Sequence, residues 1–236
     1  MIFLLNQTPP LVNKSIWIIF FIVALAVNLV GILLENEPLQ YLSKPLLVPL
    51  LAAYFMISTR NRRGFAQGLL PALLFAWIAN VLLLFTGKDE IFFLLGLSAS
   101  LLAHIFYIIF FNRVRIQENI SGRWWIIVFV IIYYAVMMYS LSYKMKDLTI
   151  PIRIFGVVIC FMCMLAMHML FLANKRAGIM MMSGGMLFIV SDSLLGFNKF
   201  NEPFLAADFL IIFFYGMAQL FIVTGAVDYI TSEAKR

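Results

Sequence analysis

One aspartate lies within an otherwise apolar stretch near the C-terminus, Ser183–Phe200. Asp192 follows Ser191, and most residues on both sides of this pair are apolar. A carboxylate inside a lipid-spanning helix costs roughly 2.5–3.5 kcal/mol on insertion scales. Asp192 should therefore face the interior of a helix bundle, where it serves in a functional site. The alternative is that it only forms a hydrogen bond with a neighbouring helix.

Polar side chains also interrupt other apolar stretches at a similar depth. Lys44 lies about one helical turn from a predicted membrane face, and Asn80 lies in the outer half of its stretch. Tyr215 and Gln219 are one turn apart, near a predicted midplane. Lys44, Asn80, Asp192 and Gln219 could converge on one cavity, which is an inference from depth alone. The alternatives are interfacial anchoring for Lys44 and an interhelical hydrogen bond for Asn80.

A histidine and a tyrosine share one face of another predicted helix. Ser100, His104 and Tyr107 are spaced four and three residues apart, so their side chains project on the same side. His104 is expected towards the inner half of the membrane. His168 lies nearer a predicted cytoplasmic end and is expected to serve packing.

The composition indicates a polytopic membrane protein. Hydrophobic residues make up 64% of the 236 positions, which is too apolar for a soluble domain of this size. The hydrophilic gaps are too short to fold alone, so residues 1–236 should form a single transmembrane domain. The net charge of +6 follows the loops and does not indicate binding of nucleic acid. Cys160 and Cys163 lie in an apolar stretch and are expected to be packing residues.

Eight apolar segments have, or nearly have, the about 20 residues that a bilayer core requires. They are approximately 16–34, 40–58, 66–86, 91–111, 124–142, 151–172, 180–197 and 205–229. The first is not followed by a cleavage site and should remain as a helix. In the second, Ser43-Lys44-Pro45 followed by Pro49 predicts a kinked helix whose freed carbonyls could line a cavity. The sequence thus predicts an all-α protein with eight transmembrane helices.

The basic residues predict the orientation of these helices. With eight spans, 11 of the 17 Lys and Arg residues fall on the side that contains both termini. Most acidic residues outside the apolar segments fall on the opposite side. Because cytoplasmic loops carry an excess of Lys and Arg, both termini should be cytoplasmic. We expect a multi-pass protein of the plasma (inner) membrane.

Several short motifs occur in an order that spans nearly the whole chain. They are Lys44-Pro45, Phe93-x-x-Gly96-Leu97, Ala103-His104-x-x-Tyr107, Gly184–Phe200 with Phe188, Ser191-Asp192 and Asn198-Lys199-Phe200, and Tyr215-x-x-Ala218-Gln219. In this order the motifs resemble the YhhN-like family, the membrane lysoplasmalogenases. The resemblance implies an eight-helix membrane protein that hydrolyses the vinyl-ether bond of lysoplasmalogens. The products would be a fatty aldehyde and a glycerophospho-base, and neither a metal nor an organic cofactor is expected.

The resemblance also implies which residues form the site. The family pattern places one aspartate in a Gly-Asp pair of the third helix and another in the Ser-Asp pair of the seventh. Asp192 matches the second, but Ala79-Asn80 stands at the first. Because an amide is neither a general acid nor a general base, Asn80 would orient water or bond to Asp192. The implied substrate contacts are Lys44, His104, Tyr107, Ser191, Asn198, Lys199, Tyr215 and Gln219.

Three functions are compatible with these residues. The first is an intramembrane hydrolase of lysoplasmalogen or a related lysolipid, with Asp192 as acid and base and Lys44 or Lys199 on the phosphate. In it, Lys44 or His104 could replace the missing second acid. The second is a lipid-binding or lipid-sensing membrane protein that has lost hydrolysis, which the Ala79-Asn80 pair suggests. The third is a small transporter, against which the lack of clear inverted repeats argues. Lysolipids and membrane lipids are the expected partners.

Overall fold

The computed structural model describes residues 15–59, 68–141, 148–201 and 203–232, and the regular secondary structure of these residues is entirely helical. The long helices are α1 (Ser15–Leu33), α3 (Leu47–Ser58), α5 (Leu70–Leu82), α6 (Glu90–Gln117), α7 (Trp124–Leu141), α8 (Thr149–His168), α9 (Lys175–Phe200) and α10 (Ala207–Ser232). The shorter elements are α2 (Glu37–Ser43) and the 3-10 turns η1 (Lys44–Leu46), η2 (Leu83–Phe85) and η4 (Met169–Phe171). The predicted all-α class is confirmed.

Seven helical segments in the described residues are long and apolar enough to cross a membrane. The remaining predicted segment, 66–86, corresponds to α5 with η2, Leu70–Phe85, which is shorter. Some helices continue beyond their predicted ends; α6 runs on through Arg113 and Arg115 to Gln117. The reason is that hydropathy marks the part of a helix that suits lipid, whereas the helix itself can continue through charged residues.

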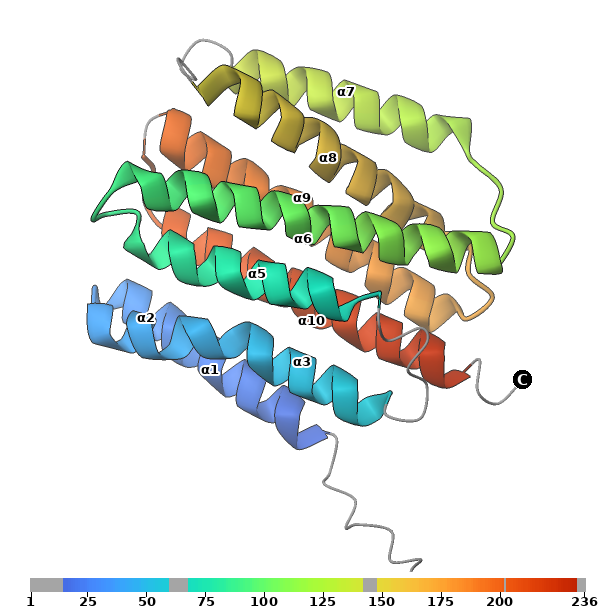
Figure 1. Ribbon diagram of the computed structural model, residues 1–236, viewed down its shortest axis with the longest axis horizontal. Coiled ribbons are helices and arrows are strands. Elements are labelled where there is room, and N and C mark those ends of the chain that lie inside the picture. The colour runs from blue at the N-terminus through green and yellow to red at the C-terminus, as the bar shows by residue number, and fades with distance from the viewer. Residues whose placement is uncertain (1–14, 60–67, 142–147, 202, 233–236) are drawn as a thin grey trace, which may run out of the picture.

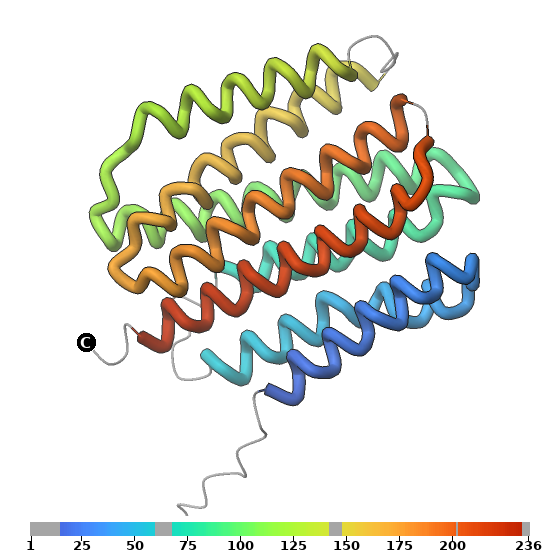
Figure 2. Tube along the Cα trace, turned by 180° about the vertical axis from the view of Figure 1, so that it is seen from behind, coloured from blue at the N-terminus to red at the C-terminus, as the bar shows by residue number. Residues whose placement is uncertain are grey.

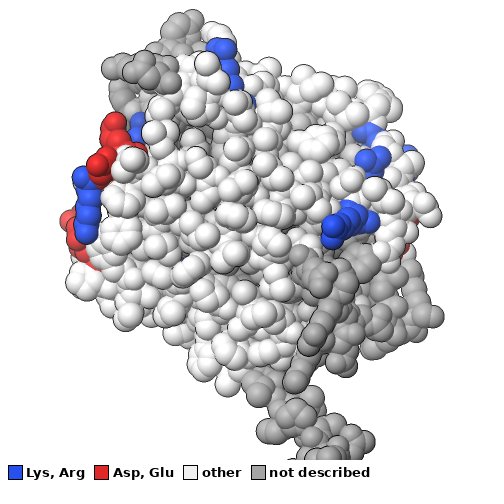
Figure 3. Space-filling view, in the orientation of Figure 1, with Lys and Arg blue, Asp and Glu red and all other residues white. Residues whose placement is uncertain are grey.

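The helices lie side by side as one bundle (Figure 1). Seven of them, α1, α3, α5, α6, α8, α9 and α10, pack in a closed ring in that order, with α10 returning to α1. Helix α7 lies outside this ring and packs chiefly against α8 (Figure 2). Large apolar side chains such as Ile131 and Val136 are exposed on its outer face, as expected for contact with lipid. Charged side chains gather at two opposite ends of the bundle, with an uncharged belt between them (Figure 3).

The two ends of the bundle are named here by residues of α9. The Asn174 end holds the start of α9 and the end of α10, and the Lys199 end holds the end of α9 and the start of α10. Between them the two helices approach closely at glycines. A Cβ atom on Gly184 would lie 2.6 Å from Cγ1 of Ile222 and 2.8 Å from the carbonyl oxygen of Ala218. Small residues therefore bring these two helices into direct backbone contact within the chain.

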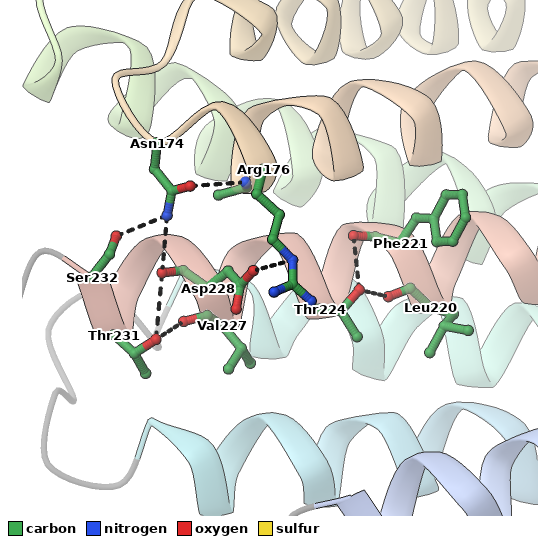
Figure 4. Close-up of polar contacts among 10 residues, drawn as sticks. Asn174, Arg176, Leu220, Phe221, Thr224, Val227, Asp228, Thr231 and Ser232 are labelled. Carbon is green, nitrogen blue, oxygen red and sulfur yellow. Dashed lines mark hydrogen bonds and ion pairs between the residues drawn. The ribbon is translucent and has the colours of Figure 1, made fainter.

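Polar contacts fasten α9 to α10 at the Asn174 end (Figure 4). The Asn174 side chain accepts a hydrogen bond from the backbone N–H of Ala177, which caps α9, and donates to Oγ of Ser232 at 3.1 Å. Nε of Arg176 lies 3.2 Å from Oδ2 of Asp228. These contacts and the glycines fix the position of the two helices relative to each other.

The predicted break in segment 40–58 is present. Helix α2 ends at Ser43, η1 covers Lys44–Leu46, and α3 resumes at Leu47. Pro45 has no N–H to donate, which favours a break at this point. The carbonyl oxygen of Pro45 is also free, because its α-helical partner would be Pro49, which has no N–H. It accepts a hydrogen bond from Nε1 of Trp77 on α5, at 2.9 Å. The freed carbonyl is thus used in helix packing, and the break places Lys44 at the wall of the cavity described next.

Candidate functional site

A polar cavity of about 430 Å³ lies inside the helix ring, towards the Lys199 end. Six of the seven ring helices contribute to its wall, together with α2, η1 and η2. Its polar lining residues are Asn28, Gln40, Lys44, Asn80, Thr86, Ser100, Ser191, Asp192, Asn198, Lys199, Asp208 and Tyr215. Seven of the ten site residues expected from the sequence are in this set. The other three, His104, Tyr107 and Gln219, are buried behind the wall.

Asp192 forms a close pair with His104. Its side chain is 11% exposed, and its Oδ2 lies 3.3 Å from Nε2 of the fully buried His104. Neither atom makes a hydrogen bond with any other described residue. Nδ1 of His104 lies 2.7 Å from the carbonyl oxygen of Ser100, which can only accept, so Nδ1 carries a proton. The contact between Nε2 and Oδ2 is attractive only if one further proton lies on the pair.

Aromatic rings hold the imidazole in place behind Asp192. The ring centroids of Phe188 and Phe155 lie 4.8 Å and 5.4 Å from that of His104, both in edge-to-face geometry. The hydrogen bond from Nδ1 to the Ser100 carbonyl fixes the orientation of the imidazole within this aromatic cage. His104 is therefore placed to exchange a proton with Asp192 and is shielded from the cavity itself.

The other two buried residues support Tyr215. The Tyr107 hydroxyl donates to Oε1 of Gln219 at 2.5 Å, and Nε2 of Gln219 donates to the Tyr215 hydroxyl at 3.3 Å. That hydroxyl in turn donates to the carbonyl oxygen of Ala76 on α5, at 3.3 Å. This sequence of hydrogen bonds joins α6, α10 and α5, and it holds the Tyr215 hydroxyl at the cavity wall.

Asn80 presents an unsatisfied donor to the cavity. Asn80 is only 5% exposed, and its Nδ2 has no hydrogen-bond partner among the described residues. Leaving a buried amide without a partner costs about 1–3 kcal/mol, unless water or a ligand takes the bond. Its NH₂ group makes no hydrogen bond to Asp192, so of the two roles expected for Asn80, orienting water is the one that this arrangement favours.

Charged groups line the cavity at the Lys199 end. Lys199 is exposed in the last turn of α9, with its ammonium group 5.0 Å from the ring centroid of Phe93. Lys44 on η1 and Asp208 in the first turn of α10 belong to the same wall. Two ammonium groups and a carboxylate therefore surround this part of the cavity. Such a set suits a ligand with a phosphate and an ammonium group.

Five polar residues of this wall were not among the site residues expected from the sequence: Asn28, Gln40, Thr86, Ser100 and Asp208. Of these, only Ser100 was placed beside an expected site residue, on the face of His104 and Tyr107. Asp208 lies within the last predicted segment, 205–229, three residues after its start. Asn28 carried a usable signal, because it is an amide within the most apolar predicted helix. Its Nδ2 donates to Oγ of Ser43 at 2.9 Å, whereas its Oδ1 has no described partner.

These features define a helical, multi-pass membrane protein with a polar cavity enclosed by its own helices. A model of the YhhN family matches residues 39–226, which is well over half of the chain. The chain therefore belongs to the YhhN family, and the match includes all of the cavity wall except its α1 residues, Asn28 and Ile32. Comparison with curated proteins and with solved structures found no match.

Proposed function

We propose that this protein is an intramembrane hydrolase that cleaves the vinyl-ether bond of lysoplasmalogen, or of a related lysolipid. The products are a fatty aldehyde and a glycerophospho-base. The observation that carries the proposal is the contact between Asp192 and His104 at the wall of a polar cavity at membrane depth. Membership of the YhhN family supports it, because this family suggests lysoplasmalogenase-like chemistry.

The reaction requires a proton donor and an activated water. Protonation of the β-carbon of the vinyl ether gives an oxocarbenium ion, to which water adds. The resulting hemiacetal then breaks its bond to the glycerol oxygen and leaves an aldehyde. Glycosidases divide similar work between two carboxylates. In this chain, Asp192 and His104 share it, since Asn80 stands where the family pattern has the other acid.

In this proposal, each member of the pair has a role. Asp192 donates the proton to the substrate carbon, and its carboxylate then stabilises the adjacent cation. Nε2 of His104, the nitrogen not engaged by the Ser100 carbonyl, shares the proton that the attacking water releases. Collapse of the hemiacetal passes the hydroxyl proton to the glycerol oxygen, so the pair ends with the protons with which it began. The free Nδ2 of Asn80 orients the water.

The charged residues of the wall bind the headgroup in this proposal. Lys44 and Lys199 contact the phosphate, because ammonium groups form strong charge-assisted hydrogen bonds with phosphate oxygens. Asp208 contacts the ammonium group of an ethanolamine or choline base. This arrangement leaves the reacting bond deeper in the cavity, towards Asp192.

We further propose that α5 with η2 forms an eighth span. The protein then lies in the plasma membrane with both termini in the cytoplasm. The 16 residues of Leu70–Phe85 extend about 24 Å at 1.5 Å per residue, slightly short of a typical core. Helix α5 packs between α3 and α6 in the ring, so it lies at the same depth as complete spans. The excess of basic residues on the side of the Asn174 end supports the orientation.

A second candidate is a lipid-binding protein without hydrolytic activity. The observation that favours it is Asn80, whose amide cannot serve as the second acid. Both candidates use the same cavity, so one experiment separates them. Aldehyde release from lysoplasmalogen is measured for the purified protein and for Asn80→Asp.

Turnover by the unmodified protein supports the hydrolase, and Asn80→Asp should then raise the rate further. Turnover by Asn80→Asp alone would instead identify the natural chain as a lipid binder. Co-purified, uncleaved lysolipid would agree with that second outcome.

A further inference from the structure

A second, apolar crevice lies on the other side of Asp192. It has a volume of about 50 Å³ and is lined by α7 and α8 on one side and by α6 and α9 on the other. Apart from Asp192, Ser193, Tyr133 and Tyr134, every lining residue is apolar. The hydroxyls of Tyr133 and Ser193 bond to each other, and Ser193 also donates to the carbonyl oxygen of Ile189. The crevice thus presents mainly hydrocarbon surface to a ligand.

The crevice and the polar cavity share part of their walls. The shared residues are Phe93, Leu97, Phe155, Leu195 and Asp192. Four of these are apolar and one is the carboxylate, so Asp192 lies where a polar compartment meets an apolar one. A molecule with a polar end and a hydrocarbon chain would place the junction of its two parts at this carboxylate. In a lysoplasmalogen the vinyl ether is that junction.

We propose that the crevice binds the hydrocarbon chain of the lysolipid while the polar cavity holds its glycerophospho-base. This inference rests on the proposed function and adds to it the direction in which the substrate lies. The vinyl ether is then held beside Asp192 by binding on both sides, which is the positioning that acid catalysis requires. The chain runs between α7 and the helix ring, where the protein meets lipid.

The walls of the crevice are suited to opening. Met137 and Met138 of α7 line it, and methionine side chains are unbranched and flexible. Helix α7 lies outside the ring and packs chiefly against α8. Gly156 of α8 and Gly196 of α9 also line it; a Cβ on Gly196 would lie 3.3 Å from Cε of Met137. Movement of the methionine side chains therefore widens the crevice without a change in the ring.

The proposal is tested by photo-crosslinking in lipid nanodiscs with the full chain. The probe is a lysophosphatidylethanolamine whose hexadecyl chain is joined by a saturated ether and carries a diazirine midway. A saturated ether cannot undergo vinyl-ether cleavage, so labelling is independent of turnover. Labels should map by mass spectrometry to crevice residues of α7 and α8.

Two neighbouring residues of α7 provide the matched variants. Met137→Trp fills the crevice and should lower crevice labelling about tenfold, equivalent to the lost burial of about two methylene groups. Val136→Trp introduces the same side chain at a position that is 61% exposed on the outer face, and its labelling should not change. Gly196→Leu fills the crevice from α9 and should reproduce the effect of Met137→Trp. Thermal unfolding of each variant confirms that the fold is retained.

Two results would overturn the proposal. One is labelling confined to the outer face of α7, and the other is an equal loss of labelling in Met137→Trp and Val136→Trp. Failure of the proposed hydrolysis would be seen separately, as no aldehyde release from lysoplasmalogen by the unmodified protein. Labelling by the ether probe would be unaffected by that failure, so the two can be distinguished.

Discussion

Helices α9 and α10 pack along much of their length, but the two ends of this pair differ in what lies between them. At the Asn174 end, hydrogen bonds and the Arg176–Asp228 ion pair join the helices directly (Figure 4). Towards the Lys199 end, both helices line the polar cavity instead. Close packing at the Asn174 end holds the two helices together, and this allows a cavity between helices at the Lys199 end.

The difference also appears in the satisfaction of polar groups. Six buried side-chain nitrogen or oxygen atoms in the described residues have no hydrogen-bond partner. Four of them belong to the cavity wall or lie directly behind it: Asn28 Oδ1, Asn80 Nδ2, Asp192 Oδ2 and His104 Nε2. Buried polar groups are normally satisfied, and exceptions concentrate at functional sites. The unsatisfied polar groups therefore lower the local stability of the Lys199 half, and the contacts of the Asn174 half offset this loss.

The largest expected effect comes from removing the Asp192 carboxylate at the wall of the polar cavity, towards the Lys199 end. Asp192→Asn should lower kcat for aldehyde release by about 10²–10⁴-fold, because an amide cannot donate the proton. Stability should change little, because the amide has nearly the shape of the carboxyl group and its NH₂ can donate to Nε2 of His104. Aldehyde assays and thermal unfolding of the same preparation test both statements. Unchanged turnover would exclude Asp192 as the acid.

A smaller loss of turnover is expected for substitution of His104, which lies behind the cavity wall. His104→Gln should lower turnover by about 10²-fold, near the lower limit for general acid–base catalysis, because Asp192 would then exchange protons with water alone. The pH–rate profile of the variant should also differ from that of the unmodified protein. A fall in rate with an unaltered profile would indicate that His104 only packs against Phe188. Tyr107→Phe, which removes a neighbouring buried hydroxyl on the same helix, should leave the profile unchanged.

The contact between Asp192 and His104 shows where sequence reasoning stops. The all-α class, seven of the membrane-spanning segments and the break at Lys44-Pro45 could be predicted from the sequence. Depth gives a residue's level in the membrane but not the direction in which its helix faces. His104 was expected in the inner half and Asp192 in the outer half, yet their side chains touch. Because α6 and α9 extend beyond the predicted segments, their midpoints lie elsewhere.

The second cavity could not be predicted for a similar reason. Met137, Gly156 and Gly196 are ordinary residues of apolar helices, and nothing in their spacing distinguishes them from residues that face lipid. Their importance arises only from the packing of α7 outside the ring, which leaves a crevice that reaches Asp192. Tertiary packing rather than local pattern decides which apolar faces become binding surfaces.

In the Asn174 half of the α9–α10 pair, substitution should affect stability rather than activity. Gly184→Ala places a methyl group 2.8 Å from a backbone oxygen of α10 and should destabilise the fold by about 1–3 kcal/mol through overpacking. Gly196→Ala is the matched control on the same helix. Its new methyl group would lie 3.3 Å from the flexible end of Met137 and 3.5 Å from Cδ1 of Leu141, so it should not destabilise the fold. Equal unfolding midpoints for the two variants would contradict the contrast between the two ends.

The smallest effects distinguish the two kinds of contact at the Asn174 end. Asn174→Ala removes the N-cap of α9 and its bond to Ser232, and should cost about 1 kcal/mol. Arg176→Ala removes only an ion pair whose arginine side chain is 80% exposed, and should cost about 0–1 kcal/mol in low salt. Added salt should reduce the effect of Arg176→Ala and leave that of Asn174→Ala unchanged, since exposed charges are screened. Unfolding measured for both variants at two salt concentrations tests this order. A larger, salt-independent loss of stability in Arg176→Ala would mean that the ion pair, rather than the cap, joins α9 to α10 at the Asn174 end.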